Sequence, residues 1–367
     1  MTENLFGGAY KGKHVLVTGH TGFKGSWLVL WLMGLGAEVA GFSSYLPSEP
    51  CNFEVLQLSN KIRNIKGDIR DYNVLTGAFD EFRPDIVFHL AAQPIVRVSH
   101  EDPLLTFSTN VQGTANVLQC VKNSDSVQAA VIITSDKCYY NVEWPWGYRE
   151  NDTLGGDDPY SASKACAEIV FKSYCASFFS TPWAPRLATA RAGNVIGGGD
   201  WARDRIIPDC VRAWSLGQEA VVRNPNATRP WQHVLEPLSG YLQLGAMLLS
   251  SSIASGEAFN FGPDARANHS VGELIAEFMA HWEGCRWRHE GSKIKESSLL
   301  KLSCDKALHS LGWYAALSFR QTVELTAQWY KGCYEGKDNM FDLSMRQIDR
   351  YIGEAASKGI RWAAGDK

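Results

Sequence analysis

An apolar segment that leads into three regularly spaced glycines constrains the fold more than any other feature of this chain. Val15, Leu16 and Val17 precede Thr18-Gly19-His20-Thr21-Gly22-Phe23-Lys24-Gly25, and a second apolar segment follows. Because glycine has no Cβ, such a turn can close tightly and bring backbone N–H groups toward a pyrophosphate at the positive end of a helix. The pattern predicts the start of a nucleotide-binding domain, although an ordinary strand-to-helix turn is the alternative.

The composition is that of a large globular protein. With 367 residues and 45% hydrophobic content, the chain can bury an extensive core, as one large α/β unit or as two interleaved domains. The formal net charge of -3 and the lack of a long Lys/Arg block argue against a nucleic acid or an anionic membrane as partner. The 9 cysteines include no Cys-x-x-Cys pair. This predicts free thiols without a chemical role, in a protein of a reducing compartment, and no metal site.

The N-terminus predicts a cytoplasmic protein, because it lacks the basic region, apolar core and cleavage site of a secretory signal. The most apolar stretch, residues 27–40, is shorter than the ~20 residues that a membrane span needs. We therefore expect it to form a buried helix.

Strand and helix patterns alternate along the first half of the chain. A helix is expected over Lys24–Leu35, and strands over Glu38–Phe42, Asp85–Pro94 and Ala129–Thr134. This alternation predicts an α/β fold with a Rossmann-type, doubly wound parallel sheet and ligands at the carboxyl ends of its strands.

Two domains are expected from this organisation. The NAD-binding Rossmann domain covers residues 1–190, and segments at about 225–255 return to it; residues 191–367 form mainly a smaller, interleaved domain for the substrate. The pattern over residues 271–279 predicts an amphipathic core helix, and the chain after about Tyr330 is expected to be a peripheral helix with a frayed end.

Cofactor contacts are expected at the glycine turn and at the ends of the predicted strands. Small residues that end a buried strand let a cofactor lie close, and Asp68 could accept from an adenine amino group, while Asp71 could cap the next helix. The predicted cofactor-binding residues are Gly19, His20, Thr21, Gly22, Phe23, Lys24, Gly25, Asp68, Ile69, Ala91, Ala92, Gln93, Tyr160 and Lys164.

The choice between NAD and NADP stays open at this point. Ser43-Ser44-Tyr45 end the second strand, where NAD enzymes usually carry Asp or Glu. Lys24 could tolerate a 2′-phosphate, or it could simply be solvated.

Residues with catalytic chemistry follow the strand that ends at Thr134. Ser135-Asp136-Lys137 leave this strand, and Tyr160 and Lys164 open a helix about 25 residues later. Residues four apart share a helical face, so the ammonium can lower the pKa of the phenol. The phenolate could then take a proton from a sugar hydroxyl, with Ser135 bonded to the same oxygen, while hydride leaves for a nicotinamide. A Tyr-x-x-x-Lys pair alone is common by chance, so the order of the motifs carries the prediction.

This order of motifs resembles that of the extended short-chain dehydrogenase/reductases. Together with Trp146–Glu150, Arg191–Trp201 and Arg229–Val234, it resembles the CDP-glucose 4,6-dehydratases, with Lys137 where other nucleotide-sugar 4,6-dehydratases have glutamate. The likeness covers about residues 10–330. It implies a lyase that uses NAD, CDP-glucose as substrate, a homodimer formed through helices of the nucleotide-binding half, and a product for the deoxysugars of surface polysaccharides such as the lipopolysaccharide O-antigen.

The resemblance also implies roles for individual residues. Tyr160, Lys164 and Ser135 serve oxidation at C4, Lys137 removes the C5 proton or stabilises the enolate as a cation, and Asp136 protonates the departing C6 hydroxyl. Hydride then returns to C6. The predicted substrate-binding residues are Asn194, Arg205, Arg229 and Trp231, with surface ion pairs or core packing as their alternative roles.

Two other functions use parts of the same set. A C4 epimerase or a reductase needs Tyr160, Lys164 and the glycine turn, but not Asp136 and Lys137. A non-catalytic NAD(H) sensor needs no proton-transfer residues. Asp136 and Lys137 therefore favour the dehydratase.

Overall fold

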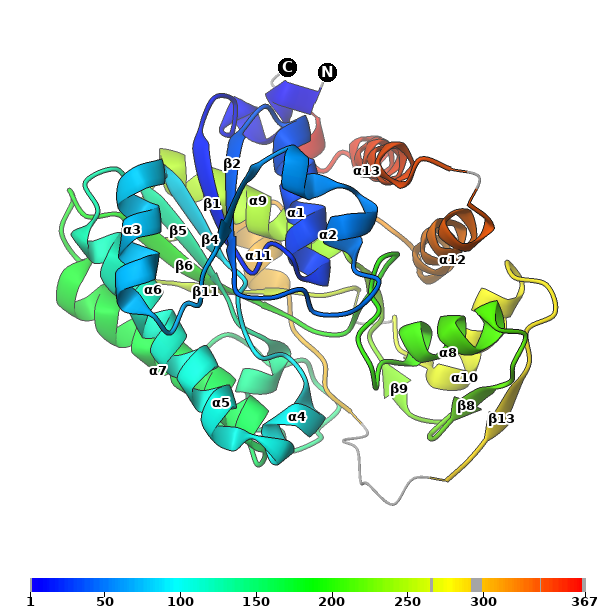
Figure 1. Ribbon diagram of the computed structural model, residues 1–367. Helices are drawn as coiled ribbons and strands as arrows, with labels where there is room; N and C mark the ends of the chain where they lie inside the picture. Colours follow the sequence, from blue (N-terminus) through cyan, green and yellow to red (C-terminus); the bar gives the residue numbers. More distant parts are fainter. Residues whose placement is uncertain (1, 265–266, 292–298, 337, 365–367) are drawn as a thin grey trace.

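The computed structural model describes residues 2–264, 267–291, 299–336 and 338–364. Its centre is a seven-stranded parallel sheet in the order β11-β6-β5-β4-β1-β2-β3 (Figure 1). The strands are β1 (His14–Thr18), β2 (Glu38–Ser43), β3 (Arg63–Lys66), β4 (Ile86–His89), β5 (Ala129–Ile133), β6 (Arg186–Ala192) and β11 (Ala258–Phe261). The strand order reverses between β1 and β4, which is where a doubly wound sheet binds its ligand.

Alternation along the strands gives the sheet two apolar faces. Val15 and Val17 of β1 belong to one buried cluster and Leu16 to another. The first face is covered by α1 (Phe23–Gly34) and α9 (Leu235–Ser250), and the second by α3 (Tyr72–Phe82), α6 (Gly113–Asn123) and α7 (Pro159–Phe178). The predicted doubly wound α/β fold is therefore confirmed.

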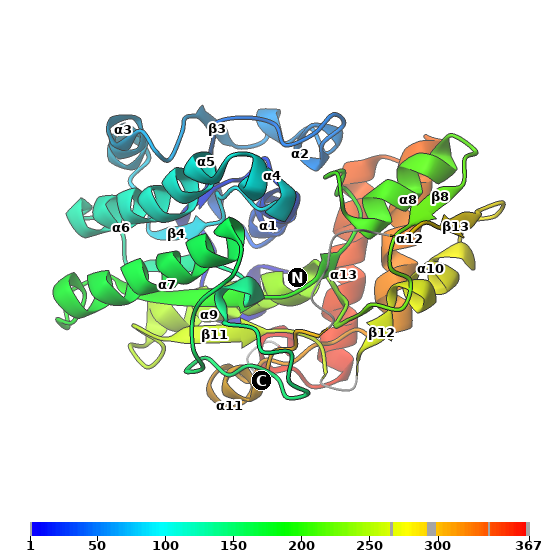
Figure 2. The same cartoon turned by 90° about the horizontal axis from the view of Figure 1, so that it is seen from below.

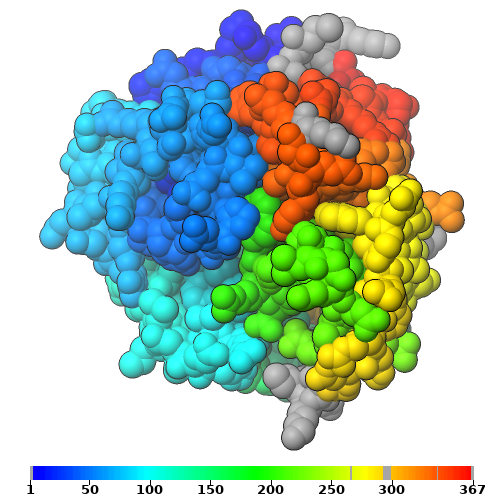
Figure 3. Space-filling model, turned by 45° about the vertical axis from the view of Figure 1, so that its right-hand side comes forward, coloured from blue at the N-terminus to red at the C-terminus, as the bar shows by residue number. Residues whose placement is uncertain are grey.

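A second group of elements lies beyond the carboxyl ends of the strands (Figure 2). It contains α8 (Ile206–Ser215), α10 (Val271–Met279), α12 (Phe319–Glu335) and short strand pairs formed by β8 (Ala220–Val222) with β13 (Trp287–His289) and β9 (Thr228–Arg229) with β12 (His269–Ser270). Two shorter strands, β7 (Val195–Ile196) and β10 (Gln232–His233), pair beside it. In Figure 3 this group, green to orange, adjoins the blue and cyan N-terminal half. The cleft described below lies between the two.

The C-terminal segment is part of the core, so the expectation of a peripheral end was wrong. Helix α13 (Met340–Ser357) packs against α1, with Tyr351 and Trp31 in edge-to-face contact. Trp362 stacks on Phe6 with ring centroids 4.9 Å apart, so the two ends of the chain meet (Figure 1). These aromatic side chains are buried, and they cover a face of α1 that would otherwise be exposed.

Two predicted helices agree with the structure to within a residue, whereas β4 ends at His89, five residues before the end of the strand predicted over Asp85–Pro94. The predicted helix from Lys24 corresponds to α1, and the predicted core helix over 271–279 corresponds to α10, whose buried side chains are Leu274, Ile275 and Phe278. Asp71 caps α3 by accepting from two backbone N–H groups. In the described part of the chain, no helix is both long and apolar enough to cross a membrane.

Candidate active site

A cleft of about 910 Å³ runs along the carboxyl ends of the strands. It is lined on one side by the glycine turn and the ends of β2, β4 and β5, and on the other by residues 192–197, 199–202, 204–209, 221–224, 229 and 231. All the predicted site residues line it except His20. The sequence thus located the cleft, and the structure brings its two sides together.

The glycine turn presents the positive end of α1 to this cleft. Gly19 has φ of +74°, and a Cβ on Gly25 would lie 2.2 Å from the Gly19 carbonyl oxygen, so side chains are excluded from both positions. Gly22 is the N-cap of α1. Because glycine has no side chain, it caps none of the backbone N–H groups in the first turn of this helix. Backbone N–H groups at a helix N-terminus suit a phosphate group, so this end of the cleft fits the pyrophosphate of a dinucleotide.

Two side chains of the turn point away from the place expected for the cofactor. The His20 ring is buried, its Nε2 lies 2.8 Å from Asn64 Oδ1, and burial lowers its pKa. The ring is therefore inaccessible from the cleft. Lys24 extends toward α9, with Nζ 3.5 Å from the Tyr241 hydroxyl, so it does not lie beside the end of β2 to meet a 2′-phosphate. Burial and nearby Arg205 lower the pKa of Lys24 to about 8.

The end of β2 is held by hydroxyl groups. Thr21 Oγ1 lies 2.8 Å from Ser43 Oγ and donates to the Tyr45 carbonyl oxygen at 2.8 Å. Asp68 lines the cleft, and its carboxylate accepts from the Arg70 guanidinium at 2.6 Å, which lowers the pKa of this carboxyl. An adenine bound at this end of the cleft would therefore lie beside an Asp68 carboxylate that is already paired with Arg70.

The catalytic candidates gather where β5 ends. Ser135 Oγ donates to Asp136 Oδ1 at 2.9 Å and accepts from the Lys137 backbone N–H at 3.2 Å, which fixes the first turn of the short helix η4 (Asp136–Cys138). The Ser135 hydroxyl is also hydrogen-bonded with the Tyr160 phenol. Ser135, Asp136 and Tyr160 are buried at the floor of the cleft and Lys137 is half-buried.

Burial dominates the ionisation of the Tyr160 and Lys164 pair. It raises the pKa of Tyr160 to about 12, against the opposing effect of the hydrogen bond between Tyr160 and Ser135, and it lowers the pKa of Lys164 to about 8. The expected lowering of the phenol pKa was therefore wrong for this structure, because desolvation of the phenolate outweighs its neighbours. The Asn110 side-chain amide donates to Ser163 Oγ at 2.9 Å and so holds the first turns of α7.

The predicted substrate-binding residues lie on the opposite side of the cleft. Arg205 Nη1 pairs with Asp200 Oδ2 at 2.7 Å, and Trp231 Nε1 donates to the His269 carbonyl oxygen at 3.2 Å. Arg229 and Asn194 line the cleft beside them. Two arginine side chains on the wall that faces the glycine turn suit a diphosphate.

Sequence reasoning missed several residues of this site. Asp200, Arg223 and Arg70 line the cleft, and Tyr241 contacts Lys24 from α9. Glu168, which lies beneath the site, is four residues after Lys164, so helical spacing alone would have placed it on the same face. The others come from loops and a distant helix, and no local pattern points to them.

Comparison with known proteins gives the family. The model for GDP-mannose 4,6 dehydratase matches residues 16–326. The chain belongs to this family. CDP-glucose 4,6-dehydratase of Salmonella typhimurium strain LT2 is 46% identical over 349 residues, which are 94% of this chain and 97% of that protein. The dehydratase family is in turn part of the extended short-chain dehydrogenase/reductases.

Solved structures share the fold of this dehydratase-family chain. The epimerase Mth375 from Methanothermobacter thermautotrophicus has a TM-score of 0.77 at 27% identity and covers 91% of this chain and 96% of its own. The dTDP-glucose 4,6-dehydratase DesIV from Streptomyces venezuelae, solved with NAD bound, has a TM-score of 0.74 at 24% identity and covers 89% of this chain and 99% of its own. Both similarities span nearly the whole fold described above.

Proposed function

We propose that this protein is an NAD-dependent lyase that converts CDP-glucose to CDP-4-keto-6-deoxyglucose and water. The observation that carries the proposal is the placement of Asp136 and Lys137 beside Ser135, Tyr160 and Lys164 at the floor of one cleft. An oxidoreductase or an epimerase needs only the last three of these residues. The Salmonella relative named CDP-glucose 4,6-dehydratase supports the choice of nucleotide.

The cofactor lies at the glycine turn in this proposal. The N-terminus of α1 receives its pyrophosphate, and residues 43–45 and 68–70 line the adenosine end of the cleft. When bound, NAD supplies an acceptor for the C4 hydride of the sugar and later returns that hydride to C6. Thr21 and Ser43 provide hydroxyl groups at the end of β2, and the guanidinium of Arg70, which lines the cleft there, is already paired with Asp68, which favours NAD over NADP.

Oxidation at C4 is assigned to the residues around Tyr160. The Tyr160 phenolate, which burial disfavours and which the positive charge of bound NAD⁺ would favour, takes the proton of the C4 hydroxyl as the C4 hydride leaves, and a 4-ketone results. The Ser135 hydroxyl, which lies within hydrogen-bonding reach of the phenol oxygen, would turn its proton from Asp136 to the phenolate, and the Lys164 ammonium, one helical turn farther along α7, would stabilise its negative charge. Proton and hydride together account for both hydrogens lost from the alcohol.

Elimination of water is assigned to Asp136 and Lys137. The 4-ketone acidifies the C5 proton, which either Lys137 removes as a neutral amine or a water held by Lys137 accepts while the Lys137 cation stabilises the enolate. Asp136 protonates the C6 hydroxyl, the C6–O bond breaks, and water leaves. Return of hydride to C6 and of a proton to C5 completes the product, so the reaction has no net change of oxidation state.

The test is to incubate the purified protein with CDP-glucose, and separately with UDP-glucose and dTDP-glucose, each with added NAD⁺. We expect loss of water, measured by mass, and a 4-keto-6-deoxy product with alkaline absorbance, from CDP-glucose alone. Loss of water from another nucleotide sugar would retain the dehydratase and change its substrate. Conversion without a change of mass would favour the epimerase instead.

We further propose a cytoplasmic homodimer. Helices α4 (Val96–Glu101), α5 (Pro103–Phe107) and α7 pack side by side (Figure 1), and Leu104 and Ile169 are 81% and 57% exposed on them. A second copy would cover these apolar side chains. All nine cysteines are unpaired, as expected in a reducing compartment. Light scattering tests the dimer, and a monomer at every concentration would contradict it.

A further inference from the structure

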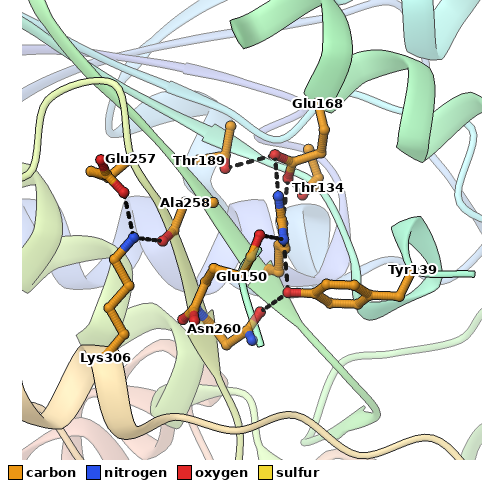
Figure 4. Close-up of polar contacts among 10 residues, drawn as sticks. Thr134, Tyr139, Glu150, Glu168, Thr189, Glu257, Ala258, Asn260 and Lys306 are labelled. Carbon is orange, nitrogen blue, oxygen red and sulfur yellow. Dashed lines mark hydrogen bonds and ion pairs between the residues drawn. The ribbon is translucent and has the colours of Figure 1, made fainter. Parts of the chain in front are cut away.

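A completely buried ion pair lies beneath the catalytic residues, and the proposed reaction has no use for its charges. Arg191 on β6 and Glu168 on α7 have side chains that are 0% exposed. Arg191 Nη2 lies 2.7 Å from Glu168 Oε2, and Nε donates to Oε1 at 2.8 Å (Figure 4). Arg191 and Glu168 thus form a bidentate pair in which both carboxylate oxygens are used.

Through Glu168, the ion pair is linked to two catalytic parts of the chain. One is the end of β5 next to Ser135, and the other is the part of α7 that carries Lys164. Its Oε1 accepts from Thr134 Oγ1 at 2.5 Å, and Thr134 is joined directly to Ser135 (Figure 4). Glu168 itself is one helical turn after Lys164 on α7. One carboxylate therefore fixes the end of β5 relative to the helix that carries Tyr160 and Lys164.

Arg191 connects the pair to the other end of the catalytic segment. Its Nη1 donates to the Tyr139 hydroxyl at 2.7 Å and to the Glu150 carbonyl oxygen at 3.0 Å. Tyr139 follows η4 directly, and its hydroxyl donates to Asn260 Oδ1 on β11 at 2.8 Å (Figure 4). The four residues Ser135, Asp136, Lys137 and Cys138 are thus held between Thr134 and Tyr139, both bonded to one ion pair.

Stability alone does not explain an ion pair in this position. Removing two charges from water costs about as much as their attraction returns, and apolar residues of similar size often replace buried pairs without loss. A pair that holds a unique arrangement of neighbouring polar groups has a different use. Here its neighbours are the two ends of the catalytic segment.

We propose that the Glu168–Arg191 pair positions the catalytic segment, with Glu168 acting through Thr134 on Ser135 and Arg191 acting through Tyr139 on Asp136 and Lys137. Both are positioning residues, since neither lines the cleft. This proposal rests on the proposed dehydratase reaction for the steps it affects. It makes different predictions for the two ends of the segment.

The hydrogen bonds that hold the two ends of the catalytic segment, at Thr134 and at Tyr139, can be removed separately by single substitutions. Thr134→Val removes the hydroxyl bonded to Glu168 and should slow C4 oxidation, because Ser135 serves that step. Tyr139→Phe removes the hydroxyl bonded to Arg191 but keeps the ring, whose centroid lies 4.9 Å from the guanidinium carbon. It should slow elimination and leave C4 oxidation unchanged, so that bound reduced nicotinamide accumulates.

Each variant has a matched control in the chain. Thr189 donates to Glu168 Oε2 at 3.0 Å, as Thr134 does to Oε1, but it does not adjoin a catalytic residue. Tyr148 stacks on Tyr139 at 5.2 Å, and its hydroxyl accepts from the Val142 N–H at 2.7 Å without contacting the pair. Thr189→Val and Tyr148→Phe should reproduce the loss of a hydrogen bond without a loss of rate.

The experiment follows formation and decay of reduced nicotinamide in single turnovers of CDP-glucose for all four variants. We expect a decrease of about ten- to a hundredfold in elimination for Tyr139→Phe, as for other small displacements of catalytic groups, with substrate affinity unchanged. Equal rates for Tyr139→Phe and Tyr148→Phe would overturn the proposal. So would Tyr139→Phe slowing both steps equally.

Amide hydrogen exchange separates failure of this proposal from failure of the proposed function. Faster exchange of the backbone over residues 135–139 is expected in Tyr139→Phe and not in Tyr148→Phe, whatever the substrate is. If the wild-type protein converts no nucleotide sugar, the proposed function fails and the exchange comparison still decides the positioning role. Unchanged exchange in this segment would exclude that role.

Discussion

At the residue scale, Lys137 separates the two steps of the proposed reaction. It is half-buried in the cleft immediately after Asp136, and C4 oxidation has no role for it. We expect Lys137→Met to lower turnover by about 10² to 10⁴, the usual effect of losing a proton-transfer residue. Reduced nicotinamide should still form on addition of CDP-glucose and then persist. Normal turnover in this variant would exclude Lys137 as base and as cation alike.

Arg205 is the residue whose role in binding is most easily tested. Its guanidinium pairs with Asp200 in the cleft, whereas Arg203, two residues earlier, is exposed and outside the lining. We expect Arg205→Met to weaken binding of CDP about ten- to a hundredfold, the equivalent of one charge-assisted hydrogen bond. Arg203→Met is the control and should bind CDP normally. Calorimetric titration measures both, and equal affinities would remove Arg205 from the diphosphate site.

At the scale of elements, the N-cap of α7 couples helix stability to catalysis. Asp158 accepts from the Ser161 N–H at 2.9 Å and from its hydroxyl at 2.6 Å, and Tyr160 lies in the same first turn. Asp71 caps α3 in the same way, far from Tyr160 along the chain. Asp158→Ala and Asp71→Ala should each cost about 1 kcal/mol in the free energy of unfolding.

Only the Asp158→Ala variant should also lose turnover, because fraying of the first turn of α7 displaces Tyr160. Urea denaturation and steady-state rates measure the two effects. If both variants lose stability and neither loses turnover, the first turn of α7 is held by its tertiary contacts and not by its cap.

At the scale of the whole molecule, Glu236 joins segments that are far apart in the chain. Its carboxylate accepts from the backbone N–H groups of Ala316 (3.0 Å) and Leu317 (2.6 Å) and from the Tyr351 hydroxyl of α13 (2.7 Å). Burial raises the pKa of Glu236 from 4.5 to about 7, against these hydrogen bonds and the nearby Lys358. Between these two pKa values the folded state binds more protons than the unfolded state.

Stability from this group is therefore present below about pH 4.5 and is lost as the pH rises through about 7. Between about pH 5 and about pH 8 the wild-type protein should lose on the order of 2 kcal/mol from Glu236. Glu236→Gln has no proton to lose at this position. Its free energy of unfolding, from urea denaturation, should fall less than that of the wild type over the same range, and parallel curves would contradict the raised pKa.

The sequence by itself determined the local features of this protein. Alternation of Val15, Leu16 and Val17 between two faces and the four-residue spacing of Tyr160 and Lys164 follow from strand and helix periodicity, and the cap at Asp71 follows from its residue type before a helix. The order of these motifs was enough to predict the sheet, and all the site residues that it suggested except His20 line the cleft, although many other lining residues were not predicted. Each of these features depends on neighbours within a few positions in the chain.

The tertiary structure decided what depends on contacts between distant residues. It turned Lys24 toward Tyr241, paired Arg205 with Asp200 across the cleft wall, and buried the C-terminal helix against α1. It also placed Arg191 beneath the catalytic segment, 23 residues from Glu168 and 52 from Tyr139. No periodicity encodes such contacts, because they are set by which strands become neighbours in the sheet and by how buried polar groups find partners there.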